Sequence, residues 1–422
     1  MNKSVPVIDF DHHSKEHTRT WVETYRYLRS YCPIAWTESH GGYYVVTRFN
    51  DVVAVAQDKV NFTKRKWQDD NGKWQGGGTI PTISGLLIPD DIDAPEWKVY
   101  RHLLNPFFAP KVIARSRAMA EVVASILVDA VIESGRVEMI DQLASPLPTI
   151  MTLEMLGMPL EHWREYAEPS HEAVYTVPGT PEYARAVERL QWGESKMGEA
   201  LKARRGNPGN DLISHITNAR TAEGEYFSDY ELMAICRQVI GGGADTTTSL
   251  LGNVFIYLSK HPEARQRLTE DPKVAPYACE EFLRFFTPIH SSARTVKQPL
   301  KVAGELLDVG DKVFMAYASA NRDENYFEDP DSVKLDRFPN PHIGFGVGIH
   351  RCLGSHMARQ SFGVLVSEML RRIPDFRVLD DQAEQYGTTG VVNGWVRVPA
   401  VFTRGRKENR DPDLAKRLLL GG

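Results

Sequence analysis

The stretch from residue 345 to residue 354 reads Phe345-Gly346-Val347-Gly348-Ile349-His350-Arg351-Cys352-Leu353-Gly354. Three glycines in ten residues let the backbone adopt unusual angles and approach another group closely. The apolar pattern that follows predicts a helix over residues 352–372, with the Cys352 thiol in its first turn. The free amides and the dipole of a helix start favour a thiolate and lower its pKa. We therefore interpret Cys352 as a ligand for a soft metal.

The alternative for Cys352 is a buried structural cysteine in a glycine turn. The chain has four cysteines and no CxxC pair: Cys32, Cys236, Cys279 and Cys352. Without a neighbouring partner cysteine, a four-cysteine zinc or iron–sulfur site is excluded at this loop. Haem with a single axial thiolate fits.

A long helix is predicted upstream of the loop. Ser228 with Glu231 three residues later forms a capping box, and apolar residues continue to Leu258. The helix has roughly 30 residues and is about 45 Å long. Three glycines at 241–243 interrupt it, each costing about 1 kcal/mol relative to alanine. Close packing against a neighbouring helix would explain this run, but a locally opened helix beside a planar cofactor explains it better.

The remaining chain is mainly helical with short strands. Helical periodicity runs through residues 96–204, and a further helix spans 275–286. Strands are predicted at residues 43–47 and between 293 and 318. Residues 64–92 form a long, glycine-rich loop, which is typical of a lid, a binding loop or a mobile segment. The fold class is mainly α with small β-sheets (α+β), without the alternating βα series of a Rossmann core.

The composition is that of a folded, soluble protein. Of the 422 residues, 42% are hydrophobic and 25% are charged, which excludes a disordered chain. The net charge of -5 argues against nucleic-acid binding as the main function. We see no apolar run long enough for a secretory signal or for insertion into a membrane. The cysteine pattern favours a reducing compartment, so we expect a cytoplasmic protein.

The cysteine loop matches the pattern F-G-x-G-x-H-x-C-x-G at every fixed position, and this is the haem-ligand signature of the cytochrome P450 family. From about residue 20 to 403 the chain resembles bacterial-type soluble members of that family. The resemblance implies the cytochrome P450 fold, with a long central helix over the haem and the cysteine loop before the last long helix. It implies one catalytic domain over residues 1–403, helix-rich with a small N-terminal β region. We assign no role to the tail at residues 404–422.

The resemblance also implies the cofactor and the residues that hold it. Haem b (iron protoporphyrin IX) would have the Cys352 thiolate as its axial ligand. Further cofactor contacts would come from Gly243, Phe345, Gly346, His350 and Gly354. The two propionates would be bound by Arg101, Arg294 and His350, with Trp97 at a position where many bacterial members have histidine.

Two further motifs follow the order of the family. The glycine run continues into Asp245 and Thr246 and is similar to the family's A/G-G-x-D/E-T. This makes them the acid–alcohol pair that delivers protons to dioxygen. Glu281 and Arg284 lie three residues apart, so they share a helix face. They resemble the family's buried E-x-x-R pair.

Four segments would overlie the distal face of the haem: residues 64–92, 168–195, 288–293 and 388–393. An apolar substrate pocket with a histidine as polar anchor is expected from Leu86, Leu87, Ile240, Ala244, Ile289, His290, Val391 and Val392. The sequence does not name the substrate. We expect a hydrophobic molecule such as a terpenoid, steroid, fatty acid or aromatic compound.

The implied activity is that of a haem-thiolate monooxygenase, which activates O2 to hydroxylate or epoxidise a small hydrophobic substrate. We expect electrons from separate proteins, either ferredoxin with ferredoxin reductase or a flavodoxin. Charged residues near the cysteine would attract an acidic redox partner: Arg337, His342, Arg351, His356 and Arg359.

Three alternatives remain open. The same fold could serve a peroxygenase, an isomerase or an oxidative-coupling enzyme, although the intact Asp245-Thr246 pair favours O2 activation. A haem sensor or electron carrier would leave the long loop at residues 64–92 unexplained. A zinc hydrolase would use His342, His350, His356 and Cys352, and the glycine spacing would then be a coincidence.

Overall fold

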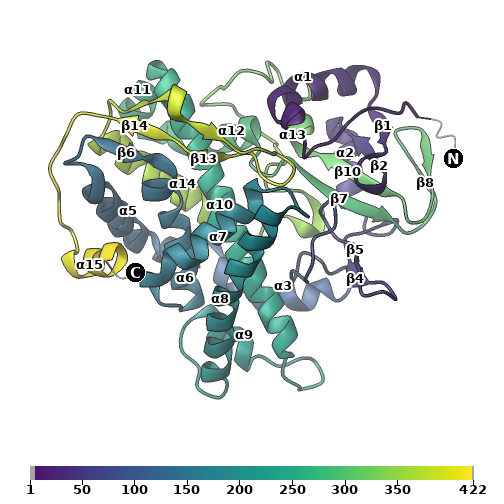
Figure 1. The fold of residues 1–422 in the computed structure, drawn as a ribbon, viewed down its shortest axis with the longest axis horizontal. Coiled ribbons are helices and arrows are strands. Elements are labelled where there is room, and N and C mark those ends of the chain that lie inside the picture. Colours follow the sequence, from purple (N-terminus) through teal and green to yellow (C-terminus); the bar gives the residue numbers. More distant parts are fainter. Residues whose placement is uncertain (1–4, 421–422) are drawn as a thin grey trace.

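The longest helix, α10 (Asp229–Lys260), crosses the helical part of the molecule, with the other helices arranged around it (Figure 1). The structure, a computed structural model, describes residues 5–420. Ser228 caps α10: its hydroxyl accepts from the Glu231 N–H, and the Glu231 carboxylate accepts from the Ser228 N–H at 2.8 Å. The helix predicted from the capping box is therefore confirmed, and it ends at Lys260, directly before His261 and Pro262.

The other helices are α1 (Lys15–Tyr31), α2 (Phe49–Gln57), α3 (Trp97–Phe108), α4 (Pro110–Arg115), α5 (Arg117–Val131), α6 (Pro146–Leu156), α7 (Trp163–Tyr175), α8 (Pro181–Arg204), α9 (Leu212–Asn218), α11 (Pro262–Glu270), α12 (Ala275–Phe286), α13 (Tyr317–Ala320), α14 (Ser355–Arg372) and α15 (Pro412–Leu420). Helices α6, α7, α8, α12 and α14 pack directly on α10. The helical periodicity over residues 96–204 and the helix at 275–286 are confirmed. The helix expected from residue 352 begins three residues later, at Ser355.

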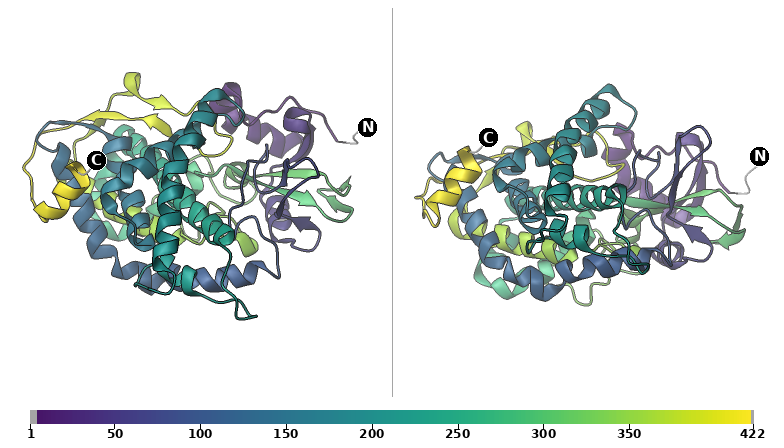
Figure 2. Two further views of the ribbon diagram at one scale, coloured as in Figure 1. Left: turned by 60° about the horizontal axis from the view of Figure 1, so that its bottom comes forward. Right: turned by 90° about the horizontal axis from the view of Figure 1, so that it is seen from below.

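The largest sheet has the strand order β1 (Ile34–Thr37), β2 (Tyr43–Val46), β10 (Lys312–Ala316), β7 (Ser291–Val296) and β3 (Phe62–Thr63). It lies with α1 at one end of the molecule, away from the helices around α10, in all three ribbon views (Figures 1 and 2). Smaller sheets pair β11 (Arg377–Val378), β14 (Pro399–Val401) and β6 (Arg136–Glu138); β12 (Glu384–Gln385) and β13 (Trp395–Arg397); β4 (Lys66–Gln68) and β5 (Trp74–Gly76); and β8 (Leu300–Val302) and β9 (Glu305–Leu307). The mainly α fold with small sheets is confirmed.

Both faces of the large sheet are buried, which explains the uninterrupted apolar run of β2. Tyr43 and Val45 face the core formed with α1, whereas Tyr44 and Val46 face the core formed with α2. Side chains alternate between the two faces of a strand, so a strand covered on both sides is apolar throughout. This sheet holds β7 firmly, and β7 carries Arg294.

A buried ion pair and a half-buried one close the 64–92 segment on itself. Lys66 Nζ lies 2.8 Å from the Asp91 carboxylate, with the two side chains 1% and 3% exposed, and Lys64 pairs with Asp90. A Cβ atom at Gly77 would lie 2.9 Å from Lys66 Cε, and the backbone there has φ +78°. The glycines of this segment therefore leave room for lysine side chains that pass beneath them.

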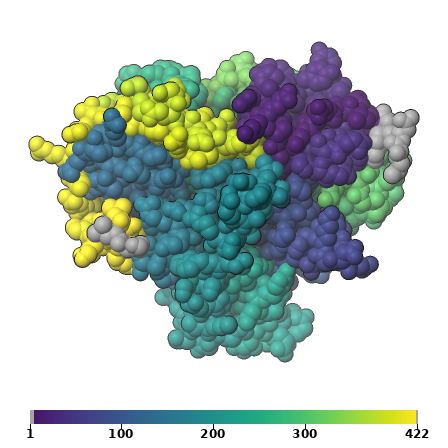
Figure 3. All heavy atoms as spheres, in the orientation of Figure 1, coloured from purple at the N-terminus to yellow at the C-terminus, as the bar shows by residue number. Residues whose placement is uncertain are grey.

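The C-terminal residues pack on the outside of the helical part (Figure 3). Asp129 of α5 accepts hydrogen bonds from the backbone N–H groups of Glu408 and Asn409, at 2.9 and 2.7 Å. The Trp163 indole N–H donates to the Leu418 carbonyl at 3.0 Å, and Leu418 belongs to the main hydrophobic core. The residues after 403 thus share the core of the preceding chain.

A buried carboxylate connects α12 to the irregular chain that precedes the cysteine loop. Glu281 and Arg284 have no exposed side-chain surface, and two hydrogen bonds of 2.8 Å join them. Glu281 also accepts from Arg337 Nε at 2.9 Å and from the Lys334 N–H at 2.8 Å. Arg284 donates to the Asn321 carbonyl at 3.0 Å. Because both charges are fully hydrogen-bonded, the pair can remain ionised in the core.

Replacing Glu281 with glutamine removes the charge and leaves two buried guanidinium groups without it. We expect a loss of about 3–5 kcal/mol in the free energy of unfolding, the range found when one partner of a buried pair is removed. The matched control is Glu182→Gln, because Glu182 and Arg185 have the same spacing but are 58% and 69% exposed. Chemical unfolding measures both variants. Equal, small effects would contradict a stabilising role of the buried pair.

Candidate active site

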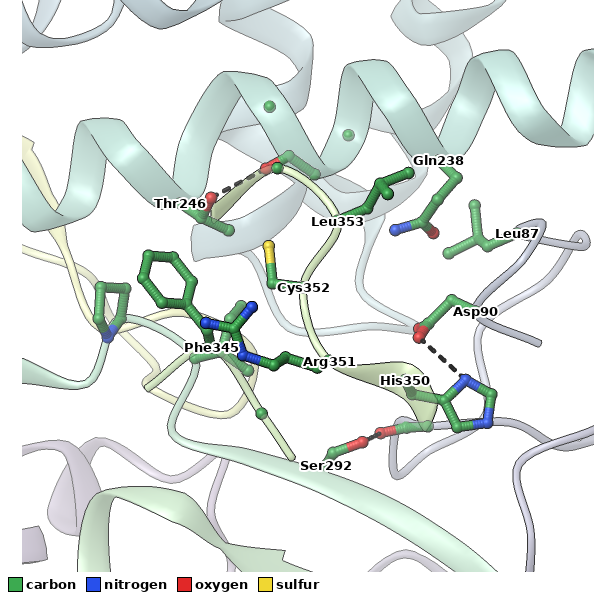
Figure 4. A pocket seen from close by; sticks show the side chains of 18 of the residues that line it. Leu87, Asp90, Gln238, Thr246, Ser292, Phe345, His350, Arg351, Cys352 and Leu353 are labelled. Carbon is green, nitrogen blue, oxygen red and sulfur yellow. Dashed lines mark hydrogen bonds and ion pairs between the residues drawn. The ribbon is translucent and has the colours of Figure 1, made fainter. Parts of the chain in front are cut away.

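A cavity of about 470 Å³ lies between α10 and the loop that carries Cys352 (Figure 4). The 64–92 segment, α3, β7 and residues 390–392 close its other sides. Chain segments that are far apart in sequence therefore meet here. All the residues that the resemblance assigned to the cofactor or to proton delivery line this cavity: Trp97, Arg101, Gly243, Asp245, Thr246, Arg294, Phe345, Gly346, His350, Cys352 and Gly354.

The sulfur of Cys352 points from the glycine loop toward α10, where Thr246 lies on the opposite wall (Figure 4). The Cys352 N–H donates to the Phe345 carbonyl at 2.8 Å, which folds the loop back on itself. This path needs positive φ angles of +68° at Gly346 and +80° at Gly348. Any other residue at either position would be strained.

The thiol of Cys352 is open to the cavity but lies deep in the protein. Burial raises its pKa, and the Gly354 N–H, Arg351 and Arg101 oppose that effect only in part. In the chain alone, burial therefore outweighs these contacts, and the pKa of the thiol is raised rather than lowered as expected. A bound metal would deprotonate the thiol directly.

The glycine run does not open α10, which stays α-helical through residues 241–243. A Cβ atom at Gly243 would lie 2.5 Å from Thr152 Oγ1 of α6, so Gly243 allows these two helices to pack closely. A Cβ atom at Gly241 would meet nothing within 4 Å, and Gly241 lines the cavity. The expectation of an opened helix is wrong, and the alternative of close packing holds at Gly243.

Asp245 and Thr246 lie side by side on α10 but have different partners. Thr246 Oγ1 donates to the Gly242 carbonyl at 2.9 Å. The Asp245 carboxylate is buried and lies 2.6 Å from His171 Nδ1 and 3.1 Å from the Tyr386 hydroxyl. Sequence reasoning missed His171 and Tyr386, because they come from α7 and from the chain after β12 and match no local motif.

Two cations lie at the end of the cavity formed by α3 and β7: Arg294 is buried and Arg101 is half-buried. Arg294 is 4% exposed and donates to the Ala293 carbonyl at 2.8 Å, and Arg101 donates to the Arg351 carbonyl at 3.2 Å. Within residues 5–420, neither guanidinium forms an ion pair with a carboxylate. A buried cation without a carboxylate is a ready site for an anionic group.

Two uncharged donors lie near these arginines. Among the described residues, Trp97 Nε1 and His350 Nδ1 are buried and have no hydrogen-bond partner. Burial lowers the pKa of His350 to about 3, so its ring is neutral at pH 7. Lys64 and Asp90 line the same end, and sequence reasoning missed both.

Comparison with known proteins identifies the family of this chain. A model of the cytochrome P450 family matches residues 194–388. The steroid C26-monooxygenase of Mycobacterium tuberculosis (strain ATCC 25618 / H37Rv) is 30% identical over 331 residues, which cover 78% of this chain and 83% of the relative. The methyl-branched lipid omega-hydroxylase of the same strain is 32% identical over 352 residues, 81% of this chain and 80% of the relative. The chain belongs to the cytochrome P450 family.

Solved structures agree with this. The Mycobacterium marinum cytochrome P450 CYP268A2 in complex with pseudoionone has a TM-score of 0.86 and 26% identity, covering 94% of this chain and all of the other. The Bacillus subtilis P450 PksS has a TM-score of 0.83 and 26% identity over the same shares. The predicted cytochrome P450 fold is confirmed, and the protein is an enzyme of the monooxygenase class.

Cytochromes P450 contain haem with a cysteine thiolate ligand, and this cavity suits that group. It presents one thiol toward its interior, a wall of α10 without side chains at Gly241 and Gly242, and two unpaired arginines at one end. A flat, largely apolar ring with two carboxylates matches such a set of donors and surfaces.

Half of the expected substrate-pocket residues lie elsewhere. Leu87, Ile289, Val391 and Val392 line the cavity. The prediction is wrong for Leu86, Ile240, Ala244 and His290. Leu86 packs on the main core, and the α10 side chains of Ile240 and Ala244 are buried away from the cavity. His290 is buried outside the cavity and packs on Trp21, with the two ring centroids 4.6 Å apart.

The charged residues near the cysteine are mostly engaged inside the protein. Arg359 and His342 bind Glu280 at 2.6 and 3.0 Å, and Arg337 binds Glu281. Of the five expected to attract a redox partner, only Arg351 and His356 are exposed.

The zinc-hydrolase alternative is wrong. In the described part of the chain, the ligand atoms of His342, His350, His356 and Cys352 do not converge on one point.

No helix within residues 5–420 is both long and apolar enough to cross a membrane.

Alanine at the two ends of the glycine run should have opposite effects on stability. Gly243→Ala places a methyl group against Thr152, and we expect a loss of about 1–3 kcal/mol from overpacking. In the haem-free protein, Gly241→Ala meets open space and should gain up to about 1 kcal/mol from helix propensity. Thermal unfolding of both variants measures this. Equal stability of the two would contradict the packing role of Gly243.

Proposed function

We propose that this cytochrome P450 uses Cys352 as the axial ligand of haem b and hydroxylates or epoxidises a small hydrophobic substrate. The observation that carries the proposal is the Cys352 thiol, which points into the cavity opposite Thr246 of α10 (Figure 4). When bound, haem supplies the activation of dioxygen and the transfer of one oxygen atom to the substrate. Residues of this chain hold the cofactor, exclude water and supply protons.

Arg101 and Arg294 would bind the two haem propionates through charge-assisted hydrogen bonds. The neutral His350 ring and the Trp97 indole add donors, because Trp97 Nε1 and His350 Nδ1 form no hydrogen bond within residues 5–420. Phe345, Gly346 and Gly354 shape the loop around the sulfur, and Gly243 sets the distance of α10 from α6.

Asp245 and Thr246 would deliver protons. Thr246 lines the cavity, and its hydroxyl now donates to a carbonyl of its own helix, from which it can turn toward the cavity. A hydroxyl is a weak acid and needs a carboxylate or water behind it to replace the proton that it gives up. Asp245, the next residue along α10, supplies that carboxylate.

The substrate would lie against Leu87, Ile289, Val391 and Val392, which give the cavity an apolar wall. The names of related enzymes support a hydrophobic substrate: one relative is named for a steroid, another for a methyl-branched lipid, and a third is named a cyclomarin C epoxidase. Terpenoids, steroids and fatty acids fit this description.

Electrons would come from separate proteins, ferredoxin with its reductase or a flavodoxin, which approach near Arg351 and His356. The four cysteines form no disulfide among the described residues, which supports a reducing cytoplasm. The catalytic domain would comprise residues 1–403, with the following tail packed on its core.

Replacing Thr246 with alanine should divert electrons from product to hydrogen peroxide. We expect the yield of product per electron pair to fall about tenfold or more, since general-acid catalysis contributes at least that much. Thr246→Ser should recover most of the yield because it restores a hydroxyl. Thr248→Val is the matched control, since Thr248 is buried and donates to the Ala244 carbonyl at 2.7 Å. An unchanged yield in Thr246→Ala would make Thr246 a packing residue.

A further inference from the structure

Three side chains that can bind a metal ion meet beside the turn between β1 and β2, and none of them lines the cavity. Asp11 and His12 precede α1, and His40 lies in the turn itself. One ligand atom from each side chain lies within 4.8 Å of the other two. Within residues 5–420, no other three histidine, cysteine, aspartate or glutamate side chains come together in this way.

The turn between β1 and β2 holds His40 against Asp11. His40 has φ +51°, and Gly41 and Gly42 follow with φ +90° and +89°. A residue other than glycine rarely adopts this left-handed conformation. The turn brings His40 Nε2 to 2.8 Å from Asp11 Oδ1. The two side chains are 22% and 39% exposed, so a metal ion can reach both from solvent.

His12 is the buried member of the group, and its ring is oriented as in many metal sites. Burial lowers the pKa of His12, so the ring is neutral at pH 7 and carries one proton. That proton is on Nε2, which lies 2.7 Å from the Ile80 carbonyl, a group that can only accept. Nδ1 therefore keeps its lone pair, onto which the Tyr43 hydroxyl donates at 2.8 Å. Metal-bound histidines commonly donate their other ring nitrogen to a backbone carbonyl in this way.

A carboxylate and two imidazoles form a set of ligands that suits zinc. Zinc binds such ligands in a tetrahedral arrangement at about 2.0–2.2 Å, which separates neighbouring ligand atoms by roughly 3.3 Å. The three side chains therefore need only small rotations to close on one ion. The Tyr43 hydroxyl also lies 3.5 Å from the Phe10 carbonyl, to which it can turn when Nδ1 binds the metal.

We propose that Asp11, His12 and His40 form a zinc-binding site, with one oxygen and two nitrogen ligands from the protein and water as the fourth. Zinc would replace the hydrogen bond between His40 and Asp11, and would join the N-terminal segment to the turn between β1 and β2. The site lies apart from Cys352, and the inference does not depend on the proposed function.

Zinc at this site would also restrain one wall of the cavity. His12 and His13 both donate to the Ile80 carbonyl, at 2.7 and 3.0 Å, and His13 Nδ1 accepts from the Thr388 hydroxyl at 3.2 Å. Ile80 lines the cavity, and so does Gly390, where a side chain would collide with the His13 ring. Figure 3 shows the N-terminal residues (purple) beside the C-terminal segment (yellow). An ion that fixes His12 would therefore also fix the chain at Ile80.

Calorimetric titration with zinc chloride tests the site in the haem-loaded protein, prepared without a purification tag and treated with a chelator. We expect one zinc ion per chain. His40→Gln and Asp11→Asn each remove a ligand and should weaken binding by about 100-fold or more, since even the loss of an outer hydrogen-bonding partner costs about 10–100-fold.

His162→Gln is the matched control and should bind zinc like the parent. His162 pairs with Glu165 at the surface, 3.4 Å apart, and the pair belongs to no group of three such ligands within residues 5–420. The absence of zinc binding by the parent, or equal binding by the parent and all three variants, would overturn the proposal.

X-ray absorption at the zinc edge identifies the ligands in the parent, so it decides even where a variant does not fold. We expect a first shell of nitrogen and oxygen at about 2.0–2.1 Å, with the outer scattering of two imidazole rings. A sulfur ligand at about 2.3 Å would place the zinc on a cysteine and overturn the proposal. Neither result depends on whether Cys352 ligates haem.

Hydrogen exchange measures the restraint on the cavity wall. At a free zinc concentration 100 times the dissociation constant, opening of the site should become about 100-fold rarer. Exchange of backbone amides that needs this opening should slow in residues 39–42 and 78–83 of the parent, and should not change in His40→Gln. Unchanged exchange in residues 78–83 of the zinc-loaded parent would contradict the link to Ile80.

Discussion

The buried charge of Glu281 organises the part of the molecule that presents the cysteine. It fixes Arg284 on α12, and Arg284 in turn holds the carbonyl of Asn321. The Asn321 side chain accepts from the Ile343 N–H at 2.8 Å, two residues before the loop at 345–354 begins. Gly344 then passes so close to α12 that a Cβ atom would lie 2.9 Å from the Leu283 carbonyl. The position of the Cys352 loop is therefore fixed by a chain of contacts that starts at one carboxylate.

Opposite this loop, α10 packs closely on a neighbouring helix with one face and leaves the cavity free of side chains with the face beside it. Gly243 brings the helix close to α6, while Gly241 and Gly242 leave the wall of the cavity without side chains. In the proposed function, the next two residues would supply protons: Thr246 places a hydroxyl at the cavity, and Asp245 places a buried carboxylate beside it. The thiol and this helix face would give the cavity a metal ligand, a flat wall and a proton source.

Local sequence patterns predict much of the fold and part of the candidate site. The capping box at Ser228 located α10, and the cysteine loop located the cavity, because both depend on residues close together in the chain. Partners that meet only in the folded protein were missed, such as His171 beside Asp245 and Lys64 beside Asp90. The failed pocket residues show the same limit, since a one-residue change along a strand or helix turns a side chain from the cavity to the core.

The central claim is that Cys352 ligates haem through its thiolate, and the ferrous–CO difference spectrum tests it most directly. The account predicts a strongly red-shifted Soret band in the purified protein. Cys352→Ser, measured in parallel, should lose this band while the protein stays folded. The same band in both proteins would contradict the ligand assignment. The absence of a haem band in folded parent protein supplied with haem would contradict the whole account.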